Sequence, residues 1–204
     1  MPIIGRREAR DQLEKWNLPR KLYEKYFVLG GELRERKIRG RWYISPEELQ
    51  QWWTSHKGRC VELSREDYHS ALAFAIVGFY KEGFSSVEWG QTKRRDIGEF
   101  LSNQTIGKLG EIAFQKFLSQ RCGVDVKISF EYAGEERGQD MFGVREGRFY
   151  RPARIKVSVK ATKSTNFNLW VVKDELEAPE SASEFYVLTR VNLPIDHLLR
   201  LFRN

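Results

Sequence analysis

The sequence predicts an α/β protein in which a small, basic, largely helical domain precedes a larger domain built on a mixed β-sheet. Segments with apolar residues at helical spacing come first, and segments that alternate apolar and polar residues follow in the second half. With 204 residues, the chain is long enough for one medium domain or two small ones. We place the domains at residues 1–56 and 57–204, joined at a polar stretch.

The composition is that of a folded protein with a charged surface, since 41% of the residues are hydrophobic and 31% are charged. No apolar run approaches the length of a membrane span, and the first residues lack the apolar stretch of a signal peptide. Cys60 and Cys122 are far apart and lack metal-ligand spacing. We therefore expect a cytoplasmic protein with no membrane partner.

Positive charge is concentrated near the N-terminus. Residues 1–60 hold 14 Lys and Arg against 8 Asp and Glu, an excess of six, whereas residues 61–204 hold 21 against 20. A basic excess in a short region is typical of proteins that bind an anionic partner, and double-stranded DNA is the partner we expect. An ordinary solvated surface is the alternative.

Two short helices are expected at the start of the first domain. Ala9 and Leu13 fall at helical spacing and predict a helix over residues 6–16. Pro19 suits the first turn of a second helix, which we expect to end near residue 27, before a pair of glycines.

A basic β-hairpin is expected at residues 32–44, with its turn near Arg39 and Gly40. Ser45 and Pro46 then start a third helix, because Ser is a favoured N-cap and Pro fits the first helical position. Basic side chains crowd on this hairpin, where they would reach DNA phosphates or a minor groove. Five of them are the predicted DNA-binding residues of this domain: Arg34, Arg36, Lys37, Arg39 and Arg41.

This order of helices and hairpin resembles a winged helix-turn-helix. The local sequence is similar to the small DNA-binding domains of the excisionase and MerR-like families, in which Gly-Arg-Trp-x-Ile leads into a helix ending in Leu-x-x-Trp. The first two helices lack the Ala-Ala…Gly-Val pattern of that family. We expect Trp42, Trp52 and Trp53 to fill the core, since so small a domain needs large aromatics. The residues that carry the resemblance are Gly40, Arg41, Trp42, Ile44, Leu49 and Trp52.

The second domain is expected to begin with two helices. Ser64 caps a helix over residues 65–82. A second helix is expected at residues 107–120, after a break at residues 102–103. Gly110 inside this helix costs about 1 kcal/mol of helix propensity, so we expect another backbone to pass close to it.

The strands of the predicted sheet follow. Glu146 and Gly147 form a hairpin turn, and the apolar strand at residues 185–191 is expected to be central. A helical turn at residues 173–177 and a last helix at residues 194–202 complete the domain. The predicted strands are residues 124–130, 139–144, 149–150, 153–161, 167–172 and 185–191.

The strand at residues 153–161 is the centre of the predicted chemistry. Its odd-numbered residues from Ile155 to Val159 point to one face, and its even-numbered residues from Lys156 to Lys160 point to the other, because strand side chains alternate. We expect the first face to be buried and the second to direct lysines towards negative charge.

Three motifs in this order resemble those of the PD-(D/E)xK nuclease superfamily, to which many restriction endonucleases belong. They are Gly-x-x-Gly-Glu ending at Glu111, Gly-x-Asp ending at Asp140, and a Val-x-Val-Lys-Ala-Thr-Lys strand containing Lys160. That family's core is a helix with a Glu, then a β-hairpin with an Asp and the (D/E)-x-K triplet. The resemblance covers about residues 102–191 and implies a restriction-endonuclease-like mixed β-sheet flanked by helices.

The resemblance implies a Mg²⁺ site that hydrolyses phosphodiester bonds. Mg²⁺ prefers carboxylate oxygens and water, and it lowers the pKa of an attacking water. Glu111, Asp140 and the carbonyl of Val159 are the expected metal ligands. Lys160 is expected to orient the water or stabilise negative charge, and Lys163 is expected to contact DNA.

The first position of the triplet departs from the family, because Ser158 stands where Asp or Glu is expected. Either Glu111 supplies the missing carboxylate, with Ser158 as a catalytic residue that bonds a metal-bound water, or the site has lost its activity. We favour the first hypothesis. Ordinary structural roles are the alternative for each residue, since Asp is common in turns and Lys protects strand edges.

The leading functional hypothesis is a Mg²⁺-dependent endonuclease for double-stranded DNA, of the type II restriction class. Cutting both strands requires two sites, so we expect a homodimer. The alternative is a non-catalytic, sequence-specific DNA-binding regulator on a nuclease-like fold. A repair or RNA-processing nuclease would share the same site.

Overall fold

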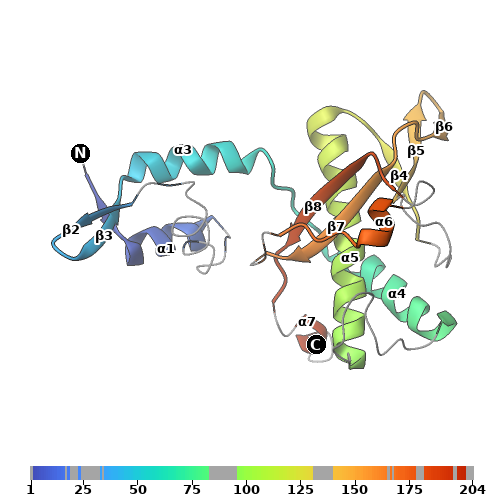
Figure 1. Cartoon of the computed structure of the whole chain (residues 1–204), viewed down its shortest axis with the longest axis horizontal. Helices are drawn as coiled ribbons and strands as arrows, with labels where there is room; N and C mark the ends of the chain where they lie inside the picture. Colours follow the sequence, from blue (N-terminus) through green and yellow to red (C-terminus); the bar gives the residue numbers. More distant parts are fainter. Residues whose placement is uncertain are drawn as a thin grey trace. The chain divides into compact units, whose positions relative to one another are not determined.

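The computed structural model divides the chain into two compact units, residues 1–60 and 61–204 (Figure 1). The division falls close to the predicted boundary, and the chain is mixed α/β. No helix among the described residues is both long enough and apolar enough to cross a membrane. The structure describes residues 2–16, 18, 23, 33, 35–82, 96–130, 140–164, 166, 168–177, 182–194 and 197–200.

The first unit contains an antiparallel sheet with the strand order β1-β3-β2. The predicted hairpin is present, and its turn has positive φ at Arg39 (47°) and Gly40 (80°). Two positive φ values are the signature of a type I′ turn, which matches the twist of the flanking strands. The first strand was not predicted, and most of the predicted second helix lies outside the described residues. The elements are β1 (Ile4–Gly5), α1 (Arg6–Lys15), β2 (Arg36–Ile38), β3 (Arg41–Ile44) and α3 (Pro46–Lys57).

A partly buried ion pair fixes α1 to the residues that precede the hairpin. The Arg6 guanidinium donates to both carboxylate oxygens of Glu35, at 2.9 Å from Nε and 2.6 Å from Nη2. The Tyr23 hydroxyl donates to the same carboxylate at 2.6 Å. Burial opposes the charged form of Glu35, but these bonds outweigh it and lower the pKa of Glu35.

The tryptophan prediction is right for Trp52, partly right for the half-buried Trp53, and wrong for Trp42. Trp52 is buried, and Trp53 stacks on Trp16 with ring centroids 5.1 Å apart. Trp42 is 40% exposed on the hairpin. Its ring lies 5.2 Å from the Arg6 guanidinium carbon, so a cation–π contact holds it at the surface instead of the core.

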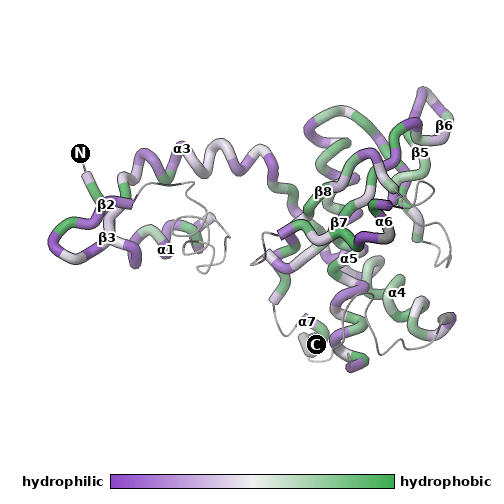
Figure 2. The backbone as a smooth tube through the Cα atoms, in the orientation of Figure 1, coloured by the Kyte–Doolittle hydropathy of each residue, from purple (hydrophilic) through white to green (hydrophobic). Residues whose placement is uncertain are grey.

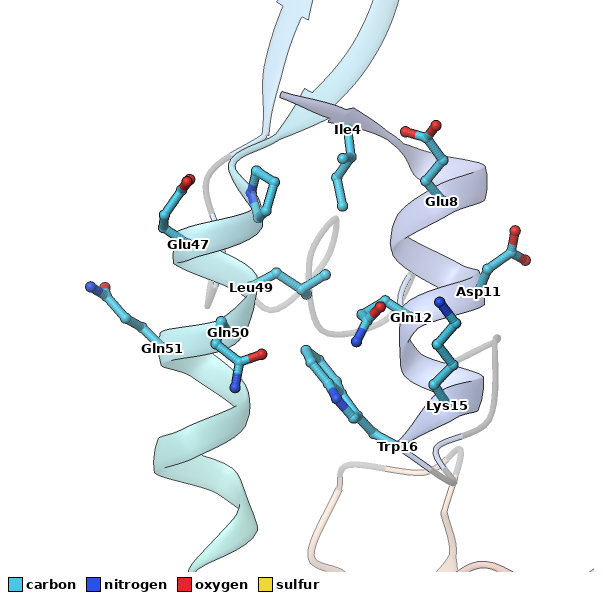
Figure 3. A pocket seen from close by; sticks show the side chains of 11 residues that line it. Ile4, Glu8, Asp11, Gln12, Lys15, Trp16, Glu47, Leu49, Gln50 and Gln51 are labelled. Carbon is cyan, nitrogen blue, oxygen red and sulfur yellow. The ribbon is translucent and has the colours of Figure 1, made fainter. Parts of the chain in front are cut away.

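A groove of about 750 Å³ lies between α1 and α3 (Figure 3). Trp16 and Leu49 point into it, whereas Glu47 points away from its centre. Its described lining residues include three acids and a single Lys, which disfavours DNA phosphates. None of the predicted site residues lines it; the lining residues are Ile4, Glu8, Asp11, Gln12, Lys15, Trp16, Pro46, Glu47, Leu49, Gln50 and Gln51.

Two long helices open the second unit. α4 (Arg65–Glu82) follows a reciprocal cap in which Ser64 N–H donates to Asp67 and Asp67 N–H donates to the Ser64 hydroxyl. α5 (Ile97–Phe117) begins ten residues before the predicted start and continues into a π-helical turn, Leu118–Cys122.

The predicted break at residues 102–103 is wrong. The Asp96 side chain accepts from Glu99 N–H and caps the helix upstream of it. Phe100 and Ile106 are both buried, on either side of the expected break. Their burial stabilises the helix through Ser102 and Asn103 more than these residues weaken it.

The described strands of the second unit form two sheets, not the single mixed sheet that we predicted. β4, β5 and β6 form an antiparallel sheet in that order, and β7 and β8 form a parallel pair. A backbone bond of 3.1 Å from Asp140 N–H to the Val157 carbonyl connects the start of β5 to β7. The strands are β4 (Val126–Ile128), β5 (Met141–Glu146), β6 (Phe149–Pro152), β7 (Val157–Lys163) and β8 (Phe185–Val191); the short helices are α6 (Lys173–Glu177) and α7 (His197–Arg200).

Three strand predictions need correction. β7 begins at Val157, and Ile155 is 49% exposed instead of buried, because the chain before Val157 is not paired as a strand. The described residues 168–172 form no strand. β8 is half-buried along most of its length, because α5 packs against the β7–β8 pair and no further described strand pairs with β8.

The core of the second unit lies between α5 and the strands. Its helical contribution comes from a stripe that includes Ile106, Leu109 and Ile112, and Figure 2 shows α5 alternating between hydrophobic and hydrophilic colouring. The predicted close approach at Gly110 is present. A Cβ added there would lie 2.3 Å from Ala161 Cβ and 2.3 Å from Thr189 Oγ1.

Gly110→Ala is therefore expected to lower the free energy of unfolding by about 1–3 kcal/mol through overpacking. Gly107→Ala, on the same helix, is the matched control, because its added Cβ meets no atom within 4 Å. That control should gain about 0.5–1 kcal/mol from helix propensity. Urea unfolding of both variants measures the difference, and equal effects would contradict the packing described for Gly110.

Candidate active site

Asp140 lies at the edge of β7 that faces away from β8. Its N–H donates to the Val157 carbonyl, and its carboxylate accepts from the Val159 N–H. Burial raises the pKa of Asp140, while the Val159 bond and the charges of Lys160 and Lys108 act in the opposite direction. The predicted turn residue is thus bonded directly to the predicted catalytic strand.

Glu111 approaches Asp140 from α5. Its side chain is 14% exposed. Burial raises the pKa of Glu111 to about 7, the Lys108 charge opposes this, and the Asp140 charge adds to it. The structure therefore brings the two predicted carboxylates close enough to interact electrostatically, although they come from a helix and from the start of a strand.

Lys108 is a neighbour of the site that the sequence did not reveal. Its side chain is 5% exposed, and its Nζ donates to Glu111 Oε2 at 2.6 Å and to the Ser129 carbonyl at 2.8 Å. The Nζ also lies 4.2 Å from the centroid of the Phe74 ring. Lys108 compensates the buried charge of Glu111, and its i,i+3 spacing was the available signal.

Lys160 lies on β7 and is paired. Its Nζ donates to both carboxylate oxygens of Glu175 on α6, at 2.8 and 2.7 Å. The side chains of Lys160 and Glu175 are 30% and 17% exposed. Sequence reasoning missed Glu175, because a Glu in a short helical turn carries no motif that links it to a strand 15 residues earlier.

The lysine-bearing face of β7 is only partly exposed, and its Lys160 is directed at the Glu175 carboxylate. Ser158 is 3% exposed, and in the β7–β8 register it lies beside Tyr186. Alternation places it on the same face as Lys160. That face is covered, so the Ser158 side chain lies in the interior and not at the edge where Asp140 binds.

The backbone of Val159 faces the edge of β7 at which Asp140 lies. A strand residue points its N–H and C=O to the same side, and the Val159 N–H is bonded to Asp140. The Val159 carbonyl therefore faces the edge that carries Asp140. Lys163, at the end of β7, is exposed.

The predicted DNA-binding residues of the first unit lie on the β2–β3 hairpin. Four of them are exposed, and Arg34 lies outside the described residues. The Lys37 ammonium lies 5.7 Å from the centroid of the Trp42 ring, on the same hairpin. The four exposed residues are Arg36, Lys37, Arg39 and Arg41.

The donors around Asp140 suit a hard divalent cation. Burial raises the pKa of both carboxylates, and the Asp140 charge raises that of Glu111 further, so their charged forms are unfavourable without a compensating cation. Together with the Val159 carbonyl they would offer an all-oxygen donor set of the kind that Mg²⁺ prefers. Within the described ranges, no group of three His, Cys, Asp or Glu side chains stands close enough together to hold a metal without water or backbone ligands.

Comparisons of the chain with protein-family models, with curated proteins and with solved structures gave no match. Assignments of function to this site therefore depend on its own geometry.

The raised pKa of Glu111 predicts a pH-dependent stability. An unfolded Glu loses its proton near 4.5, whereas folded Glu111 keeps it to about 7, so the folded state binds more protons between these values. In metal-free protein this group should make stability fall as pH rises from 4.5 to 7, by an amount on the order of 3 kcal/mol.

Urea unfolding with a chelator, measured across this pH range, tests the effect. Glu111→Gln should flatten the dependence, and Glu146→Gln, at an exposed side chain, should keep the wild-type slope. If the stability of Glu111→Gln still fell with rising pH as steeply as that of wild type, the pH dependence would not come from Glu111.

Proposed function

We propose that the protein is a Mg²⁺-dependent endonuclease that hydrolyses phosphodiester bonds of double-stranded DNA, as a type II restriction enzyme does. The observation that carries this proposal is the convergence at one edge of β7. Asp140 bonds to Val159 there, Glu111 lies close enough for the Asp140 charge to raise the pKa of Glu111, and Lys160 follows on the strand. An acidic pair with an adjacent lysine is what metal-assisted phosphodiester cleavage requires.

Each side chain has a distinct role in this proposal. Asp140, Glu111 and the Val159 carbonyl would hold the cation, which neutralises charge on the scissile phosphate and activates water. The Lys108 ammonium balances the negative charge of Glu111 when no cation is bound. Lys160 stabilises negative charge that develops on the phosphate. Ser158 has no role in this proposal, because its side chain is buried.

The basic hairpin supplies affinity for the DNA backbone. Its four exposed basic side chains lie on one short turn, whereas the groove between α1 and α3 has an acidic lining. A homodimer of the chain would place one site on each DNA strand.

The alternative function is a non-catalytic, sequence-specific DNA-binding regulator. The ion pair between Lys160 and Glu175 favours it, because a lysine engaged by a carboxylate is less available to a phosphate. The absence of a carboxylate at Ser158 favours it as well.

Cleavage of plasmid DNA in Mg²⁺ separates the two functions. Wild type should give discrete fragments, and Asp140→Asn, which retains an oxygen for the Val159 N–H, should lower the rate by about two orders of magnitude or more. Asp125→Asn is the control, since Asp125 is an exposed partner of Arg145 and Tyr150. Intact plasmid across Mg²⁺ and Mn²⁺, with a retained gel shift, would support the regulator.

Binding of a DNA duplex at several salt concentrations tests the hairpin. Arg39→Ala and Arg41→Ala should each weaken binding and reduce the slope of log K against log salt by about 1. Lys15→Ala, whose side chain lines the acidic groove, should leave affinity and slope unchanged. Equal losses of affinity in the three variants would indicate that binding depends on the overall charge of the protein and not on contacts made by the hairpin.

A further inference from the structure

An acidic residue outside the three sequence motifs, Glu175, lies beside the face of β7 that carries Ser158 and Lys160. Glu175 reaches Lys160 from α6, and its carboxylate accepts two bonds from the same ammonium. The contact joins residues 15 positions apart, so it depends on tertiary structure and not on helical spacing.

Glu175 differs from an ordinary surface acid. Its side chain is 17% exposed, whereas Glu177 on the same helix is 63% exposed and pairs with Lys173 at 3.5 Å. A two-bond contact between partly buried partners is stronger and better oriented than an exposed single contact. α6 thus contributes Glu175 to a partly buried ion pair and Glu177, two residues later, to an exposed one.

The Lys160 ammonium is fixed from a second direction. It lies 6.0 Å from the centroid of the Tyr186 ring, and the Tyr186 hydroxyl is itself bonded to Ser183 N–H at 3.1 Å. The charges of both Lys160 and Glu175 act on the Asp140 carboxylate. Glu175 and Tyr186 therefore restrict the rotamers of a lysine that stands beside the acidic edge.

We propose that Glu175 is the positioning residue of Lys160: it lies beside the face of β7 on which Ser158 provides no acid, and it holds the ammonium ready for the phosphate. The metal ligands remain Asp140, Glu111 and the Val159 carbonyl. This inference rests on the proposed nuclease function, but the contact itself is testable without activity.

Chemical labelling tests the contact in the full-length protein. The protein is treated with an acylating reagent, N-hydroxysuccinimidyl acetate, and labelling of each lysine is followed by peptide mass spectrometry. An ammonium that donates two bonds to a carboxylate reacts slowly, so Glu175→Gln should raise the labelling rate of Lys160 by about threefold or more.

The second pair on α6 supplies the matched control. Glu177→Gln should change labelling of Lys173 by less than about twofold, because that pair is exposed. Labelling of Lys108, whose side chain is 5% exposed, reports whether the second unit of the Glu175→Gln variant is still folded. An unchanged rate at Lys160 in a folded Glu175→Gln variant overturns the inference, whatever the activity of the wild type.

Kinetics and metal binding then distinguish a positioning residue from a ligand. Glu175→Gln should lower kcat by about tenfold or more while KM for DNA stays within about threefold. Its Mg²⁺ affinity, measured by titration calorimetry, should also stay within about threefold of wild type. A tenfold loss of Mg²⁺ affinity would make Glu175 a ligand and overturn the positioning role. Wild type that cleaves no DNA, while Lys160 labelling responds as expected, would contradict the proposed function and leave the contact standing.

Discussion

The close approach of α5 to β7 at Gly110 is the constraint on which the candidate site depends. Any side chain at this position would clash with Ala161 and Thr189. Glu111 follows Gly110 directly, and Lys160 precedes Ala161. This close helix–strand contact thus lies one residue away from two of the site residues, and it brings Glu111 within electrostatic reach of Asp140. Packing and chemistry are coupled here, because widening the gap between helix and strand would separate the carboxylates.

Acidic and basic side chains alternate around this contact, and their charges explain part of the change in each pKa value. Lys108 compensates Glu111, and Lys160 is held between Asp140 and Glu175. The two acids at the centre still have raised pKa values, because burial outweighs the ammonium groups nearby. An additional cation at the centre would relieve this imbalance, and that is the physical basis for assigning a metal to the edge of β7.

Elements with local sequence signals were predicted correctly, whereas predictions failed where tertiary contacts determine the structure. The Ser45 cap, the turn at Arg39 and Gly40, and the close approach at Gly110 were all visible in residue types, and the structure contains each of them. The break near Ser102 was wrong, because burial on both sides sustains the helix. Trp42 was assigned to the core because size suggested burial, whereas Arg6 holds it at the surface.

The site itself was predictable only in part. The order of Glu111, Asp140 and Lys160 suggested their convergence, since a hairpin and a packed helix bring such residues together. The burial of Ser158 was not predictable, because alternation assigns it a face without saying what covers that face. Lys108 was missed although its i,i+3 spacing to Glu111 was visible, and Glu175 was missed because no spacing rule identifies its tertiary ion pair with Lys160.

A crystal structure with Mn²⁺ in place of Mg²⁺ tests whether the edge of β7 binds a metal, because anomalous scattering locates the ion without reference to activity. We predict one ion per chain at the edge of β7, at about 2.0–2.4 Å from carboxylate oxygens of Asp140 and Glu111 and from the Val159 carbonyl. An ion bound elsewhere, or Glu111 still bonded to Lys108 with the edge empty at saturating Mn²⁺, would contradict this prediction.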